Sequence, residues 1–171
     1  MSNFSLLLAR NRVFAATNAW RDVPMIPRQQ AFLITCLDPR VDPGVVLGLE
    51  PGDALVVRNA GGRVTDAVIG DVAFISFMGE QLMPAGPLFE VAVLHHTQCG
   101  TGLLADENPR QLFARRTGYD EAALAATAVT DPAVTVRADV EKLLSAGQVS
   151  PRITVSGHVY DVETGGLREI T

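Results

Sequence analysis

The sequence predicts one α/β domain with a mostly parallel sheet of four to five strands and helices on both faces. Short apolar runs at 31–36, 54–59 and 88–96 have the length and composition of strands, and the run at 31–36 has the pattern of a strand buried on both faces. Helical patterns separate these runs, and strands that alternate with helices form parallel sheets through right-handed crossovers. The length of 171 residues and the hydrophobic content of 47% fit a single domain over residues 1–171.

The first predicted elements are a helix and two strands. Residues 4–18 carry apolar side chains at near-helical spacing and should form an amphipathic helix, the main part of an N-terminal arm over residues 1–20. The prolines of the RDVPMIP segment end this helix, because proline lacks an amide donor and disfavours helix in the residue before it. The strand at 31–36 comes next, then a brief helical turn in DPGVVLGLEPGD, and then the strand at 54–59.

Longer helices flank the third strand. Residues 65–82 should form a largely buried helix capped by Thr65 or Asp66, and residues 107–130 should be helical but irregular. The segment 131–147 has an N-cap aspartate, a proline in the first turn and a glycine stop, which together predict a helix most clearly. The chain then closes with a strand, a TGG turn and a short return strand.

Composition argues against two classes of partner and sets an expected compartment. The formal net charge is −5 and the lysines and arginines are scattered, so no basic stripe is present for nucleic acid. No apolar run approaches the ~18 residues of a membrane span, and the SLLLA segment lacks the basic lead of a secretory signal. We therefore expect a cytoplasmic protein, in which Cys36 and Cys99 serve a metal or catalysis rather than a structural disulfide.

The chemistry-bearing residues follow the ends of two predicted strands. Cys36 ends the first strand, while His96 and Cys99 lie at the end of the third. If these strands are neighbours, the three side chains meet in the crevice beyond their carboxyl ends. Two thiolates and an imidazole suit Zn²⁺, and three protein ligands with one exchangeable position are typical of catalytic zinc. The fourth ligand would be Asp38 or a water molecule.

Three motifs resemble those of one known family. CLDPR, VVRNAGG and HHTQCG are similar to the Cys-x-Asp-x-Arg, Arg-Asn-Ala-Gly and His-x-x-Cys-Gly patterns of the β-class carbonic anhydrases. The NRVFA helix, LEPGDALVVRNAGG and the closing ITVSGHVYDVETGGLREI also occur in the family's order, so the resemblance covers most of the chain. The HHT and NAGG doublets are most similar to a short bacterial and archaeal branch.

The resemblance implies a role for each of the five residues. Cys36, His96 and Cys99 would bind one Zn²⁺ per chain, and Asp38 with Arg40 would form the catalytic dyad for reversible hydration of CO₂ to bicarbonate and a proton. A zinc ion with two thiolate ligands acidifies water less than one with three imidazoles, so a nearby acceptor is useful. An ionised Asp38 can accept a hydrogen bond from the attacking oxygen, and the planar donor fork of Arg40 can hold it in place.

The family resemblance also implies a homodimer or a higher homo-oligomer, and it leaves other functions open. Carbonyl sulfide and carbon disulfide are linear molecules like CO₂, and enzymes of this fold hydrolyse them. A non-catalytic zinc-binding or redox module, in which Cys36 and Cys99 hold a structural metal or cross-link, is a further alternative.

Three residues near the predicted site depart from the family pattern. Pro39 stands where serine or alanine is usual and stiffens the backbone of the dyad. Gln98 replaces the commoner aspartate and removes a negative charge, and Thr101 stands where this branch often has methionine. All three changes spare the ligands, but they leave the rate and the substrate open.

Two further histidines and the NAGG segment have weaker predicted roles. His95 should pack at the end of the strand or bond the backbone, with a proton relay as the alternative. His158 lies in an alternating strand and should be structural. The glycines of NAGG either only permit a tight turn or allow Arg58 and Asn59 to line the crevice.

Overall fold

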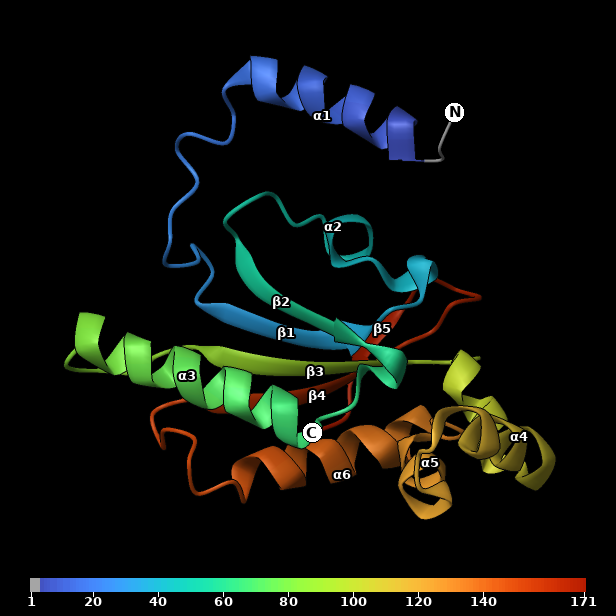
Figure 1. Ribbon diagram of the computed structural model, residues 1–171. Coiled ribbons are helices and arrows are strands. Elements are labelled where there is room, and N and C mark those ends of the chain that lie inside the picture. Colours follow the sequence, from blue (N-terminus) through green and yellow to red (C-terminus); the bar gives the residue numbers. More distant parts are fainter. Residues whose placement is uncertain (1–3) are drawn as a thin grey trace.

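A five-stranded sheet forms the centre of the computed structural model, which describes residues 4–171 (Figure 1). The strand order is β2-β1-β3-β4-β5. Strands β1 to β4 run parallel, and β5 pairs with β4 in the antiparallel direction. The strands are β1 Ala31–Cys36, β2 Ala54–Asn59, β3 Glu90–His96, β4 Thr154–Tyr160 and β5 Leu167–Glu169. The predicted strands and the short return strand are confirmed.

The helices also lie where the sequence predicts them. Within residues 4–171, none is long and apolar enough to cross a bilayer. Short 3-10 segments follow the carboxyl ends of β1, β2 and β3 at Pro39–Val41, Ala60–Gly62 and Gly100–Ala105. The α-helices are α1 Phe4–Thr17, α2 Pro43–Val46, α3 Asp66–Leu82, α4 Glu107–Thr117, α5 Glu121–Thr127 and α6 Pro132–Leu144.

Local hydrogen bonds explain where these helices begin. Thr65 caps α3, because its hydroxyl accepts a hydrogen bond from the amide of Val68. Asp131 caps α6 by accepting hydrogen bonds from the amides at the start of the helix, where Pro132 fits because it has no amide to satisfy. The positive φ of 77° at Gly118 ends α4.

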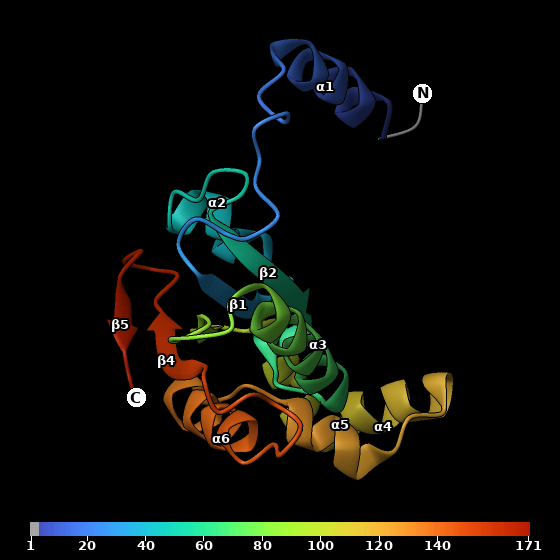
Figure 2. The ribbon, with the colours of Figure 1, turned by 90° about the vertical axis from the view of Figure 1, so that its left-hand side faces the viewer.

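The main core lies between the sheet and the pair α3 and α6, which lie on the same side of the sheet in Figures 1 and 2. Valine and isoleucine side chains dominate it, as expected for parallel strands buried on both faces. Its central members are Ile34, Val68, Val72, Val91, Val93, Val136, Val140 and Val159. Helix α2 lies on the opposite side of the sheet.

Helix α3 is less buried than the sequence predicts. One stripe, which includes Val68, Val72 and Gly79, faces the core. Phe74 and Phe77 point away from the core and are 62% and 56% exposed. The prediction of a largely buried helix was wrong because a straight helix presents only one stripe to a sheet, however apolar its other faces are.

The strand order fixes the position of the predicted crevice. Strand β1 lies between β2 and β3, so the chain goes to one side of β1 first and then to the other. The carboxyl ends of β1 and β3 are therefore neighbours at the point where the strand order reverses, which is where ligands bind in open parallel sheets.

Candidate metal centre

Two sulfur atoms and one imidazole meet at this edge of the sheet. Cys36 is the last residue of β1, His96 is the last residue of β3, and Cys99 follows in the turn after β3. Their ligand atoms all lie within 4.8 Å of one another, and the two Sγ atoms are 3.9 Å apart. Both cysteines are buried and free of disulfide bonds. The structure thus brings together the three residues that the sequence singles out.

The hydrogen bonding of His96 tests whether this cluster fits a metal. His96 Nδ1 lies 2.8 Å from the carbonyl oxygen of Thr97 and donates to it. Within the described part of the chain, the buried Nε2 atom has no hydrogen-bond partner. A buried nitrogen without a partner is unfavourable unless it binds an ion. In metal-binding histidines, the ring nitrogen that does not bind the metal usually donates a hydrogen bond to a carboxylate, a backbone carbonyl or water. His96 follows this pattern, so this set of donors fits Zn²⁺.

The two thiols differ in acidity because they share a proton. The contact with Cys36 lowers the pKa of Cys99 to about 6, and Thr101 assists because its hydroxyl lies 3.2 Å from Cys99 Sγ. The same contact between the sulfurs raises the pKa of Cys36 to about 11, while the amides of Asp38 and Gly61 act in the opposite direction. One sulfur is therefore ionised at neutral pH, as a metal ligand must be.

Asp38 and Arg40 form a two-pronged ion pair beside the cluster. Arg40 Nε and Nη2 donate to the two carboxylate oxygens at 3.0 and 2.7 Å, and the Arg40 amide donates to Oδ1 at 2.9 Å. The Arg40 guanidinium lowers the pKa of Asp38 to about 2. Pro39 begins the short helical turn between them, so its fixed φ supports the pair.

The neutral side chain of Gln98 holds the other side of Arg40. The guanidinium donates to the Gln98 carbonyl at 3.1 Å and to its side-chain oxygen at 3.4 Å. The Gln98 amide nitrogen in turn donates to Glu163, in the β4–β5 turn, at 2.6 Å. Sequence reasoning missed Glu163, because nothing in the local sequence signals a contact between residues 65 positions apart.

Arg58 braces the loop that carries Cys36 and Asp38. Its guanidinium donates to the carbonyl oxygens of Cys36 and Asp38 at 2.9 and 2.8 Å, and to Asp42 at 2.6 Å. Asn59 instead closes the following turn, because its side chain bonds both the amide and the carbonyl of Arg63. Of the two possibilities for this segment, Arg58 thus serves the crevice and Asn59 serves the turn.

The two glycines of that turn allow it to contact the first ligand. Gly61 and Gly62 have φ of 84° and 67°, which other residues rarely adopt. A Cβ atom at Gly62 would lie 2.9 Å from the backbone nitrogen of Cys36. The turn therefore needs glycine both for its conformation and for its close approach to the strand.

The other histidines lie outside the cluster. His95 is fully buried, with Nδ1 2.8 Å from the hydroxyl of Thr135 and Nε2 3.2 Å from the carbonyl oxygen of Gly62. His158 lies in β4, 2.9 Å from the hydroxyl of Ser156. Both positions agree with structural roles for these residues.

Known proteins share both the sequence and the fold. A family model described as carbonic anhydrase matches residues 31–116. The chain is 32% identical to β-carbonic anhydrase 1 of Mycobacterium tuberculosis (strain ATCC 25618 / H37Rv), with 94% of each chain covered. It is 28% identical to the carbon disulfide hydrolase of Acidianus sp. (strain A1-3), covering 88% of this chain and 82% of that one. The crystal structure of a carbonic anhydrase from Streptococcus mutans superposes with a TM-score of 0.79 at 32% identity, covering 100% and 99% of the two chains.

Proposed function

The chain belongs to the β-carbonic anhydrase family, and on that premise we propose that it catalyses the zinc-dependent, reversible hydration of CO₂ to bicarbonate and a proton. The observation that carries this proposal is the position of the cluster. Cys36, His96 and Cys99 supply three soft donors within 4.8 Å of one another, next to a carboxylate that is fully paired with Arg40.

In the proposed mechanism, Cys36, His96 and Cys99 would hold one Zn²⁺ per chain. When bound, the ion would supply Lewis acidity, which lowers the pKa of water from about 15.7 toward ~7. Asp38 stays ionised at neutral pH and accepts a hydrogen bond from the attacking water, which orients its lone pair toward CO₂. Arg40 holds both carboxylate oxygens, which keeps Asp38 from becoming a fourth ligand. The product proton then leaves to solvent or buffer.

A second candidate reaction is the hydrolysis of carbonyl sulfide or carbon disulfide. The carbon disulfide hydrolases among the relatives favour it, although their identity to this chain and their coverage are lower than for the β-carbonic anhydrase. Both reactions add water to a linear molecule with a central electrophilic carbon, so the same residues would serve either.

Parallel assays separate the two reactions. Stopped-flow measurement of CO₂ hydration by zinc-loaded protein at pH 7 to 9 should give rates far above buffer. Hydrogen sulfide release from carbonyl sulfide and from carbon disulfide, measured on the same preparation, should be slower by comparison. Sulfide release without CO₂ hydration would move the assignment to the second reaction. Zinc content without turnover of any substrate would identify a non-catalytic zinc-binding module.

We further infer that the protein is a homodimer in which residues 4–20 form an arm; residues 1–3 of the predicted arm lie outside the described part of the chain. Every residue described in α1 is exposed, and Figure 2 shows the helix standing apart from the sheet. Its side chains Leu7, Leu8 and Phe14 are each more than 40% exposed. Monomeric proteins rarely expose a contiguous apolar surface of this kind to water. Sedimentation velocity at micromolar concentration should give the mass of two chains. A single-chain mass would contradict this inference.

We place the protein in the cytoplasm because of its two thiols. Cys36 and Cys99 are free and lie 3.9 Å apart, so an oxidising compartment would favour a cross-link that removes two ligands. Thiol alkylation in fractionated cells should find both cysteines reduced and in the cytosolic fraction.

A further inference from the structure

The most buried carboxylate among the described residues lies behind the metal centre, on α6. Asp139 is 3% exposed and accepts hydrogen bonds from three directions. Arg63 Nε and Nη2 donate to its two oxygens at 2.7 and 3.0 Å, and the Val64 amide donates at 3.0 Å. Burying a charge at this depth is unfavourable unless the charge is paired and hydrogen-bonded, as it is here.

Asp139 binds the end of the turn at Ala60–Gly62, which we call the glycine turn. Arg63 and Val64 directly follow Gly62, and the Arg63 guanidinium also donates to the carbonyl oxygen of Ala126 at 2.7 Å. The turn is thereby tied to α6 on one side and to α5 on the other. Asn59 closes it from within, through its two hydrogen bonds to Arg63.

His95 joins Asp139 to the strand that carries the second ligand. Its Nε2 atom lies 3.2 Å from both Asp139 Oδ2 and the carbonyl oxygen of Gly62. Both neighbours are acceptors, so this nitrogen carries a proton, and the other ring nitrogen pairs with Thr135 of α6. The ring next to His96 is therefore fixed in orientation by α6 and by the turn.

The turn in turn contacts the first ligand. Gly62 packs against the backbone of Thr35 and Cys36 with no room for a side chain. Asp139 is thus linked to Cys36 through the glycine turn and to His96 through the neighbouring His95.

We propose that Asp139 is a positioning residue for the metal centre, which fixes the glycine turn against Cys36 and the ring of His95 beside His96. This inference rests on the proposed zinc site and extends it to a residue on a helix far from it in the sequence. Groups that orient metal ligands in this way typically contribute 10- to 100-fold, in round numbers, to metal affinity.

Zinc release to an excess of a chromophoric chelator tests the proposal, with the absorption spectrum of the Co²⁺-loaded protein as a second readout. Asp139→Asn keeps the shape and removes the charge. It should release zinc about 10-fold faster and alter the thiolate-to-cobalt absorption band. The matched control is Val140→Ala, which removes buried volume from the next position of α6, where the side chain faces Gly157 of β4. This control should unfold more easily yet release zinc at the wild-type rate.

If Asp139→Asn does not fold, Thr135→Val decides, because it removes the partner of His95 Nδ1 and otherwise only hydrogen bonds within the first turn of α6. It should accelerate release by a few-fold. Unchanged release in the folded Asp139 or Thr135 variant, or equal acceleration in Val140→Ala, would overturn the proposal. Wild-type protein that holds no zinc would instead contradict the proposed function, and this inference with it.

Discussion

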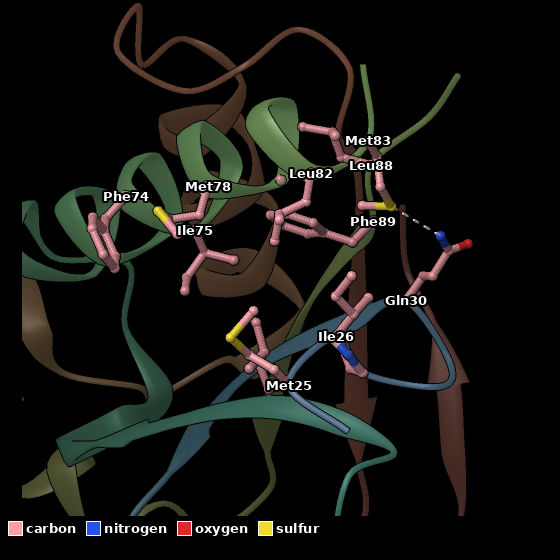
Figure 3. A pocket seen from close by; sticks show the side chains of 13 residues that line it. Met25, Ile26, Gln30, Phe74, Ile75, Met78, Leu82, Met83, Leu88 and Phe89 are labelled. Atoms are coloured by element: carbon pink, nitrogen blue, oxygen red, sulfur yellow. Dashed lines mark hydrogen bonds between the residues drawn. The ribbon is translucent and has the colours of Figure 1, made fainter. Parts of the chain in front are cut away.

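The two ends of the sheet are built on different physical principles. At the carboxyl ends of β1 and β3, polar atoms are held by directional hydrogen bonds, as in the pair of Asp38 and Arg40. At the amino ends lies a pocket of about 330 Å³, lined by methionine, phenylalanine and leucine side chains with Gln30 as a polar exception (Figure 3). We expect the function of the carboxyl end to be sensitive to the loss of single polar atoms. The contribution of the amino end should instead scale with the apolar area that it buries.

The pocket at the amino ends of the strands is lined from two sides and opens to the surface. Phe74 and Met78 of α3 line one side of it, and Met25 and Ile26 line the other. Phe74 remains 62% exposed, so the pocket opens onto an apolar surface. An apolar surface of this kind is typical of contact with another chain, which agrees with the proposed homodimer.

The largest difference between the ends is expected from removing a ligand. Cys99→Ser replaces a soft thiolate by a hydroxyl, which binds Zn²⁺ poorly at neutral pH. Zinc affinity should fall by more than ~10²-fold, beyond the effect of groups that only orient ligands. Chelator competition and elemental analysis measure this. Met78→Ala, in the pocket, is the control and should keep full zinc; equal zinc content in both variants would remove Cys99 from the ligand set.

A smaller effect is expected when the metal stays and only the dyad changes. Asp38→Asn should retain zinc and lower kcat for CO₂ hydration by about 10²-fold. The neutral amide is a weaker acceptor than the carboxylate for the hydrogen bond from the attacking water. The matched control is Asp66→Asn, which breaks the exposed pair with Lys142 and should leave kcat unchanged. Unchanged turnover in Asp38→Asn would end the catalytic role of the dyad.

The buried ion pair behind the metal centre predicts acid sensitivity. Burial raises the pKa of Asp139, but the hydrogen bonds from His95 and Arg63 outweigh it, so the folded pKa lies below the usual value. A lowered folded pKa stabilises the protein above the unfolded pKa of about 3.9, and this stability is lost as pH falls through the folded pKa. We expect Asp139→Asn to lose about 2 kcal/mol of the free energy of unfolding at pH 7.

Urea titrations between pH 7 and pH 3 measure this effect. The difference between wild type and Asp139→Asn should shrink as the pH falls, since the wild-type carboxylate becomes protonated. Asp66→Asn, whose carboxylate is almost fully exposed in its pair with Lys142, should follow the wild-type curve. If the free energies of unfolding of wild type and Asp139→Asn differed by the same amount at all pH values, Asp139 would not be the ionised group that stabilises the fold.

The smallest effect is expected from the apolar end. Phe74→Glu places a charge on the exposed surface of α3 and should weaken the proposed dimer by roughly 10-fold in Kd, without changing zinc content. Sedimentation velocity over a dilution series measures it. Phe113→Glu, on the exposed side of α4, is a control of the same chemistry and should leave the mass unchanged. An unaltered dissociation curve for Phe74→Glu would separate this surface from the dimer.

Most secondary structure was readable from the sequence because local signals agreed with one another. The strand at Ala31–Cys36, the cap at Thr65 and the helix after Asp131 each follow from apolar patterning or from a short polar side chain at a helix start. The exposure of Phe74 did not follow, because the orientation of a helix depends on what packs against it.

The sequence by itself determined the Asp38–Arg40 spacing and the alternation of strands and helices, and it predicted which three residues would bind the metal, since each is carried by a local motif. Only the tertiary structure decided that β1 and β3 are neighbours, that Glu163 holds Gln98, and that Asp139 supports the glycine turn. The contacts of Gln98 with Glu163 and of Arg63 with Asp139 join residues 65 and 76 positions apart in the sequence. No local sequence pattern predicts them, because they form only when the chain folds.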